Sequence, residues 1–225
     1  MKTEKPYPPS WYAASATRID ADVCILGAGY TGLAAALELA EAGYKVVVLE
    51  AERIGWGASG RNGGQAIAGF GCGEAKLEAL VGFDDARKMF DLSREGLQWL
   101  RGRIRKHGIE CDWRDGHATV PIKPRQQREV MAAVEDFNTR YGYPVEWWDR
   151  EKLRTQLASD RYLGALYDPN SGHLHPLEYA LGLARAAMAA GVRIFEHSRV
   201  TQLLRGTKPV FKTSAGEVHC DFAIL

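Results

Sequence analysis

The sequence predicts a mixed α/β fold, α+β overall, that begins with a βαβ unit. Three observations predict this unit: an apolar run at residues 22–26 that ends in a glycine, an alanine- and leucine-rich stretch at 31–42, and a second apolar run at 45–49. Short apolar runs are typical of buried parallel strands, and apolar residues three and four positions apart are typical of a helix. A right-handed crossover is expected to join the two strands.

The remainder of the chain predicts further helices and strands. Amphipathic spacing indicates helices at 84–107, 124–140 and 176–190, and Gly191 ends the last of them. Apolar runs indicate the remaining strands, which are 163–167, 192–195, 199–204, 210–213 and 218–225. Residues 111–122 are expected to form a strand pair around Asp115-Gly116, and residues 1–18 an irregular arm.

The composition argues against several classes of function. The 225 residues carry a net charge of +1, so bulk electrostatics gives no reason to expect a nucleic acid or an anionic membrane as partner. The N-terminus lacks the apolar segment of a secretory signal, and the apolar stretch 23–40 is too interrupted to span a membrane. Four scattered cysteines without metal-type spacing indicate reduced thiols and no metal site. A cytoplasmic location is therefore expected.

A glycine motif lies between the first expected strand and the first expected helix. Gly27-Ala28-Gly29-Tyr30-Thr31-Gly32 fits the GxGxxG pattern. In this context the first glycine permits a tight turn, the second lets the backbone approach a pyrophosphate, and the third allows the helix to pack closely on the strand. The motif therefore predicts a Rossmann-like dinucleotide site at the positive end of the helix.

An acid follows the second expected strand. Glu50 lies 18 residues after Gly32, where a carboxylate accepts hydrogen bonds from ribose hydroxyls and its charge disfavours a 2′-phosphate. NADP is therefore not expected. The alternative is a glycine turn together with an unrelated surface acid.

The next segment favours FAD over NAD. Residues 55–73 are dense in glycine and include Gly57-Ala-Ser-Gly-Arg-Asn-Gly-Gly-Gln65, where NAD dehydrogenases usually continue with further βα units. A loop of this length inside a compact domain is usually functional. Its N–H groups, with the side chains of Ser59, Arg61 and Asn62, can line a pyrophosphate and reach a flavin ring. An NAD-dependent dehydrogenase and a flexible linker remain the alternatives.

Several of these segments resemble known flavoproteins. Asp22–Gly32 and Val46–Glu50 are similar to the FAD-dependent oxidoreductases of the D-amino-acid oxidase and glycine oxidase superfamily. Ser10–Ser15, Ala58–Gln65 and Gly172–Pro176 resemble the gamma-glutamylputrescine oxidoreductase branch of that superfamily. The resemblance spans essentially the whole chain, and it looks like the N-terminal half of these enzymes.

The resemblance implies an FAD-binding domain interwoven with a substrate domain, which is incomplete here. Residues 1–68 would form the first part of the FAD domain, 69–175 a portion of the substrate domain, and 176–225 a return to the FAD domain. The glycine loop contains neither His nor Cys, so non-covalent FAD is expected.

The resemblance also implies which residues contact FAD. The pyrophosphate would lie on Gly27, Ala28, Gly29, Tyr30, Thr31 and Gly32, and the adenosine ribose on Glu50 with Ala51 beside it. The ribityl chain and flavin ring would lie beside Ser59, Gly60, Arg61, Asn62, Gly63, Gly64 and Gln65. Val200, expected in the strand after the late helix, would contact the adenine through its backbone.

The implied chemistry is oxidation of a C–N bond in a small amine or amino acid, such as a gamma-glutamylputrescine-like substrate. Flavin N5 would accept a hydride, and dioxygen or another electron acceptor would reoxidise the flavin. Arg61 can stabilise negative charge on the flavin, and His173 and His175 can line the substrate cavity or position a proton. The alternatives are a structural guanidinium and a turn whose histidines cap or pack.

Two other groups are interpreted as structural. Trp147-Trp148 is expected to pack in a core or interface rather than to form a cavity wall, and the basic run at 101–106 is expected to be a solvated helix face. Asp221–Leu225 is an apolar strand pattern without a cap or polar tail, so we expect the chain to be cut there or completed by a partner segment. A non-catalytic FAD- or nucleotide-binding fragment or subunit therefore remains an alternative.

Overall fold

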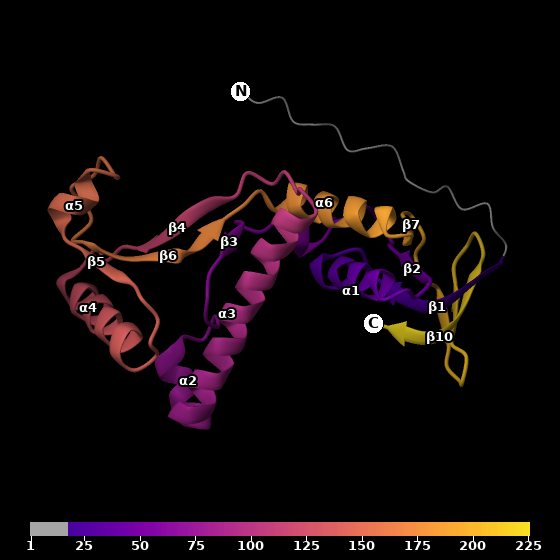
Figure 1. Cartoon of the computed structure of the whole chain (residues 1–225), viewed down its shortest axis with the longest axis horizontal. Helices are drawn as coiled ribbons and strands as arrows, with labels where there is room; N and C mark the ends of the chain where they lie inside the picture. Colours follow the sequence, from indigo (N-terminus) through magenta and orange to yellow (C-terminus); the bar gives the residue numbers. More distant parts are fainter. Residues whose placement is uncertain (1–17) are drawn as a thin grey trace. The chain divides into compact units, whose positions relative to one another are not determined.

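The computed structural model describes residues 18–225, and within it the chain divides into two compact units (Figure 1). Of the described residues, the first unit contains 18–63 together with Lys106–Cys111 and His175–Leu225, and the second contains Gly64–Arg105 and Asp112–Leu174. The irregular arm expected at the N-terminus, with the segment Ser10–Ser15, lies outside the described residues. The assignment of FAD to the first unit and of substrate to the second stays a prediction.

The first unit is built on a mixed sheet with the strand order β7-β2-β1-β10-β9-β8. Strand β1 pairs in parallel with β2 and β10, β2 pairs in parallel with β7, and β9 pairs antiparallel with β10 and β8. The strands are β1 (Arg18–Leu26), β2 (Val46–Leu49), β7 (Arg193–Phe195), β8 (Gln202–Leu204), β9 (Val210–Lys212) and β10 (Glu217–Ile224). The predicted α/β class and its βαβ unit are confirmed.

Burial explains why these residues form this sheet. All four residues of β2 are buried, as a continuous apolar run in a central parallel strand requires. Helices α1 (Tyr30–Glu41) and α6 (Pro176–Ala189) pack against each other in the same unit. Leu33, Ala36 and Leu37 form the buried stripe of α1, at the spacing expected of an amphipathic helix.

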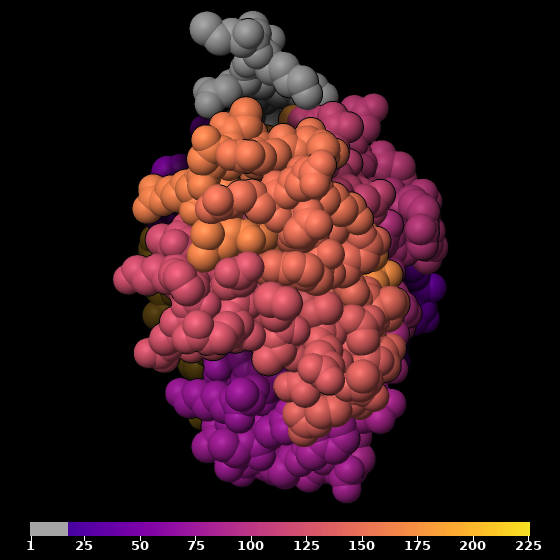
Figure 2. All heavy atoms as spheres, turned by 90° about the vertical axis from the view of Figure 1, so that its left-hand side faces the viewer, coloured from indigo at the N-terminus to yellow at the C-terminus, as the bar shows by residue number. Residues whose placement is uncertain are grey.

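The second unit contains a smaller antiparallel sheet. Strand β6 pairs with β3, β4 and β5, helix α4 packs against β5 and β6, and helix α5 packs against β5. The elements are β3 (Gln65–Ala66), α2 (Glu74–Val81), α3 (Phe83–Lys106), β4 (Arg114–Thr119), α4 (Pro124–Thr139), β5 (Glu146–Trp148), α5 (Arg150–Arg154) and β6 (Ala165–His173). Helices α4 and α5, with the loops around them, form most of the face that Figure 2 shows. The buried core of the second unit consists of Phe90, Tyr141, Tyr143, Val145 and Leu166.

Two sequence-based expectations about strands are wrong. Residues 111–122 contain one strand, β4, rather than a strand pair, because Asp115-Gly116 lies at a register shift opposite β6. Gly116 has a φ of +94°, and a Cβ there would lie 2.8 Å from Cε2 of the Tyr167 ring, so the glycine serves a bulge and a close ring contact. The strand expected at 199–204 begins only at Gln202, which leaves Val200 in a loop.

The cysteines, which all lie in the described part of the chain, form no disulfide bonds in the structure. All four cysteines are free; Cys24, Cys111 and Cys220 are buried and Cys72 is exposed. Burial raises the pKa of the Cys24 thiol, which keeps it protonated. Between residues 18 and 225, no helix combines the length and the apolar character that a membrane span needs.

Candidate dinucleotide-binding site

The carboxyl ends of three parallel strands of the first unit lie along one edge of its sheet. Gly27 follows β1, Glu50 follows β2 and Glu196 follows β7. In open α/β sheets, ligands bind at this edge. The edge therefore defines the candidate site.

The phosphate loop depends on glycine at two positions. Gly27 has a φ of +99°, which favours glycine, and its N–H donates to the carbonyl of Leu49 at 2.8 Å. A Cβ on Gly32 would overlap the carbonyl oxygen of Gly27 and lie 3.4 Å from Cγ2 of Ile25. The first turn of α1 can therefore approach β1 only with glycine at position 32.

The N-terminus of α1 is open to an anion. Gly29 is the N-cap residue and supplies no side-chain cap, and no acid lies in the first turn. The N–H of Tyr30 donates to Oγ of Ser59 at 3.0 Å, and a Cβ on Gly29 would also lie 3.0 Å from that oxygen. A helix N-terminus without a competing acid attracts phosphate, so this end of α1 fits the pyrophosphate of FAD.

Glu50 joins the end of β2 to the phosphate loop. Its Oε2 accepts a hydrogen bond from the N–H of Ala28 at 2.8 Å, and its Oε1 accepts one from the N–H of Glu52 at 2.8 Å. The side chain is only half-buried. Each carboxylate oxygen keeps a second lone pair, so Glu50 can also accept hydrogen bonds from ribose hydroxyls.

The loop that contains Ser59 is held in place by its own polar groups. It includes the 3₁₀ turn η1 (Ala58–Gly60), and the Asn62 amide donates to the carbonyls of Ala58 and Ser59, both at 3.0 Å. The guanidinium of Arg61 lies over the Trp56 ring, 4.5 Å from its centroid. These contacts give the loop a defined conformation, which the flexible-linker alternative does not predict.

Tyr30 ties the phosphate loop to the start of α6. Its hydroxyl donates to the carbonyl of Pro176 at 2.9 Å, and its ring packs edge-on against Tyr179 with centroids 5.2 Å apart. Burial raises the pKa of Tyr30, so the hydroxyl stays a donor. The GxGxxG pattern alone gave no role to this side chain.

The two candidate histidines have different surroundings. His175 is the N-cap of α6, and its Nδ1 accepts a hydrogen bond from the N–H of Glu178 at 3.2 Å. His173 is exposed at the end of β6 in the second unit, where it pairs with Gln65 of β3. Gly64, with a φ of +75°, precedes that strand. Gln65 and His173 are thus neighbours, whereas His175 caps a helix.

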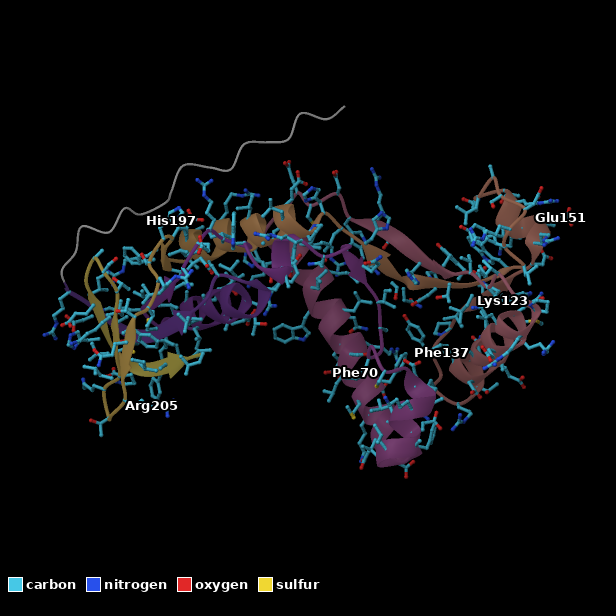
Figure 3. All side chains as sticks on the ribbon, turned by 180° about the vertical axis from the view of Figure 1, so that it is seen from behind. Phe70, Lys123, Phe137, Glu151, His197 and Arg205 are labelled. Atoms are coloured by element: carbon cyan, nitrogen blue, oxygen red, sulfur yellow. The ribbon has the colours of Figure 1, made fainter. Side chains whose placement is uncertain are left out.

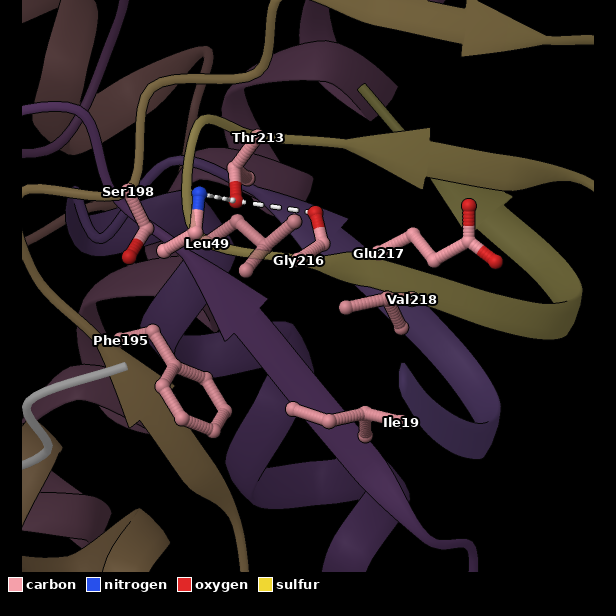
Figure 4. A pocket seen from close by; sticks show the side chains of 9 residues that line it. Ile19, Leu49, Phe195, Ser198, Thr213, Gly216, Glu217 and Val218 are labelled. Carbon is pink, nitrogen blue, oxygen red and sulfur yellow. Dashed lines mark hydrogen bonds between the residues drawn. The ribbon is translucent and has the colours of Figure 1, made fainter. Parts of the chain in front are cut away.

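Val200 lies between β7 and β8 rather than in a strand. It is partly buried against the apolar cluster of the first unit, and the expected adenine contact through its backbone stays a prediction. A cavity of about 20 Å³ lies beside Leu49, Phe195 and Ser198 (Figure 4). A volume of that size holds about one water molecule and is too small for an adenine.

A larger cavity of about 280 Å³ lies inside the second unit. Phe70 and Phe137, both labelled in Figure 3, line it together with core residues of that unit. The buried carboxylate of Asp168 also lines it and accepts hydrogen bonds from the Tyr143 hydroxyl at 2.8 Å and from the hydroxyl of Ser171. Asp168 is therefore satisfied within the unit, and it has a structural role.

The tryptophan pair and the basic run also have structural partners. Trp148 stacks on Tyr167 with ring centroids 4.0 Å apart, and neither Trp147 nor Trp148 lines the 280 Å³ cavity. Arg101 pairs with Asp115 at 2.6 Å, and Arg103 lies over the Trp99 ring. These contacts agree with the interpretation of both features as packing and surface groups.

Sequence reasoning missed one acid at the candidate site. Glu196 is only 6% exposed, and it accepts a hydrogen bond from the N–H of Ile54 at 2.7 Å. It follows β7 as Glu50 follows β2. That shared position, an acid directly after a buried parallel strand, was the available signal.

Comparisons with known proteins show the family of this chain. The family model of the FAD dependent oxidoreductases matches residues 22–225. A probable oxidoreductase OrdL of Haemophilus influenzae is 48% identical over 207 residues, which cover 91% of this chain and 48% of the relative. The gamma-glutamylputrescine oxidoreductase of Escherichia coli is 42% identical over 227 residues, covering 96% of this chain and 53% of the relative. The chain thus spans about half the length of the curated relatives it matches.

Solved structures share the fold. Glycine oxidase from Geobacillus kaustophilus matches with a TM-score of 0.72 and 22% identity, over 91% of this chain and 54% of that one. L-amino acid deaminase from Proteus myxofaciens matches with a TM-score of 0.77 and 23% identity, over 98% of this chain and 48% of that one. At this level of identity the likeness establishes the fold.

Proposed function

This chain belongs to the FAD dependent oxidoreductase family, and on that premise we propose that it is the FAD-binding part of an enzyme that oxidises a C–N bond of a gamma-glutamylputrescine-like amine. The observation that carries the cofactor assignment is the hydrogen bond from Ala28 N–H to Oε2 of Glu50, which joins a phosphate loop to a ribose-type acid. The substrate assignment is supported by the 42% identity to the relative that bears that name.

Each part of the site has a proposed task. The segment Gly27–Gly32 holds the pyrophosphate at the N-terminus of α1, Glu50 and Ala51 flank the adenosine ribose, and the backbone of Val200 contacts the adenine. The segment Ser59–Gln65 lies along the ribityl chain and flavin ring. When bound, FAD supplies a hydride acceptor at N5 for the carbon that bears the amine.

The chain's own titratable groups then orient the substrate and handle the proton. Because Nδ1 of His175 accepts the N–H of Glu178, a neutral His175 ring carries its proton on Nε2. That nitrogen is the atom from which His175 can donate to a substrate. His173 has no such constraint from a helix cap, and Arg61 supplies positive charge within the loop that follows η1.

The first experiment identifies the cofactor and tests its reduction. We expect the purified chain to carry FAD, released intact on denaturation, and its flavin absorbance to bleach when gamma-glutamylputrescine is added without oxygen. A chain that retains FAD but is not bleached by any amine would support the non-catalytic FAD-binding alternative. A colourless chain stabilised by NAD and not by FAD would contradict the cofactor assignment itself.

A second experiment tests Glu50. A carboxylate offers two acceptor oxygens, whereas an amide offers one and must serve Ala28, Glu52 and the ribose with it. We therefore expect Glu50→Gln to weaken FAD binding about tenfold, equivalent to about 1.4 kcal/mol. Glu52→Gln is the matched control, because the Glu52 carboxylate pairs with Arg199 at 2.7 Å and has no proposed ribose contact. Equal FAD affinity in both variants would exclude Glu50 from the site.

A further inference from the structure

Glu196 lies where the segment after β7 pairs with the segment after β2. The residues around it form three backbone hydrogen bonds: Glu50 N–H to the Phe195 carbonyl at 2.9 Å, Ser198 N–H to the Glu50 carbonyl at 2.8 Å, and His197 N–H to the Glu52 carbonyl at 2.9 Å. These three bonds pair the segment 195–198 with the segment 50–52.

Beyond Glu52 a side chain continues the pairing. Two residues after Glu52, the N–H of Ile54 donates to Oε1 of Glu196 at 2.7 Å. Ile54 is fully buried and Glu196 is 6% exposed, so water does not compete for this bond. A buried N–H group requires an acceptor, which Glu196 provides.

The segment fixed in this way determines where the Glu50 carboxylate lies. The N–H of Gly55 donates to the Ala28 carbonyl at 3.0 Å, so the turn is attached to the phosphate loop just after Ile54. The N–H of Glu52, at the start of the same turn, donates to Oε1 of Glu50 at 2.8 Å. A change in the position of the turn would therefore move one of the two donors that orient Glu50.

From this geometry we propose that Glu196 is a positioning residue of the nucleotide site: its buried carboxylate holds the Glu52–Gly55 turn so that Glu50 is aimed at the adenosine ribose. Glu196 acts through Ile54 and Glu52, and it has no direct contact with the ribose. The inference rests on the proposed role of Glu50 as the ribose acceptor.

The test measures recognition of the ribose hydroxyl separately from overall affinity. ADP and 2′-deoxyADP displace FAD from the flavin-loaded chain, and the recovery of free flavin fluorescence gives the dissociation constant of each. The parent chain is expected to bind ADP about tenfold more tightly than 2′-deoxyADP, because only ADP supplies the 2′-hydroxyl to a charged acceptor. A residue that only stabilises the fold would weaken both nucleotides equally and leave this ratio unchanged.

Three substitutions at position 196 separate the effects. Glu196→Ala and Glu196→Asp remove or shorten the acceptor, and each is expected to reduce the ratio below about threefold. Glu196→Gln keeps an acceptor oxygen at the same distance from the backbone and is expected to retain the parental ratio. If Glu196→Ala fails to fold, the contrast between Glu196→Asp and Glu196→Gln still tests whether the ratio depends on the acceptor at position 196.

Two further variants serve as controls. Asp168→Ala removes a buried carboxylate of the second unit, which is expected to lower thermal stability without altering the ratio. Glu50→Ala is expected to abolish the discrimination. If Glu50→Ala preserves the ratio, the ribose assignment itself is wrong. If Glu50→Ala brings the ratio to about one and every folded variant among Glu196→Ala and Glu196→Asp keeps the parental ratio, the positioning role alone is overturned.

Discussion

The close approach of α1 to β1 allows a prediction for Gly32→Ala. The added methyl group would overlap the Gly27 carbonyl oxygen and lie 3.3 Å from the carbonyl carbon. Because the obstacle is backbone, the strain belongs near the upper end of the usual overpacking range, about 3 kcal/mol. Alanine in a helix recovers about 1 kcal/mol relative to glycine, which leaves a net loss of about 2 kcal/mol.

Two measurements check this magnitude. In a chain of this size, a loss of 2 kcal/mol lowers the melting temperature by about 4–8 °C. FAD binding is weakened only by the part of this strain that the empty phosphate loop relieves by relaxing, so the expected loss of affinity is at most about 30-fold. Thermal denaturation followed by circular dichroism and FAD titration followed by flavin fluorescence measure the two effects.

Gly206→Ala is the matched control for Gly32→Ala. No heavy atom lies within 4 Å of where a Cβ on Gly206 would be placed, so the change is expected to stay within about 0.5 kcal/mol. If Gly32→Ala melts and binds FAD like this control, close helix–strand packing is not the reason for glycine at position 32.

Two further predictions concern other parts of the chain. Hydrogen bonds from Arg140 and then from Tyr141 lower the pKa of Glu78, so its contribution to stability is present above pH 4.5 and is lost as the pH falls through the lowered value. Glu78→Gln should flatten this acid limb in melting temperatures measured against pH, and parallel curves would contradict the assignment. In the first unit, a Cβ on Gly182 would lie 3.1 Å from Cβ of Ile109. Gly182→Ala should lower the free energy of unfolding by about 1–3 kcal/mol. Ile109→Ala removes the crowding, so the double variant should lose less free energy of unfolding, measured with denaturant, than the sum of the two single variants.

The parts of the fold that could be predicted depend on local signals. The βαβ unit is encoded by apolar runs, a helix stripe and glycines within one short stretch, and its bounds were expected to within a few residues. Glu50 was also expected directly after the second strand and lies there, while its role as the ribose acid stays a prediction. The long helices could also be predicted, because their amphipathic spacing repeats over several turns.

The parts that could not be predicted depend on partners far along the chain. Asp115-Gly116 is equally typical of a turn and of a bulge, and only the Tyr167 ring, about fifty residues later, distinguishes the two. Glu196 meets its partner Ile54 across 142 residues. Val200 was expected in a strand because residues 199–204 have an apolar strand pattern, yet the strand starts only at Gln202.

The pairing of β1 with β10 has a consequence for the chain during its synthesis. The two strands are in register from Arg18 with Glu217 to Ile25 with Ile224, so about 200 residues separate the partners. At about 5–20 residues per second, a ribosome needs roughly 10–40 s to deliver β10 after β1 has emerged. Throughout that interval β1 can pair with β2 along one edge, while its other edge stays exposed to solvent and to neighbouring nascent chains. Translation speed therefore sets how long this edge can take part in aggregation.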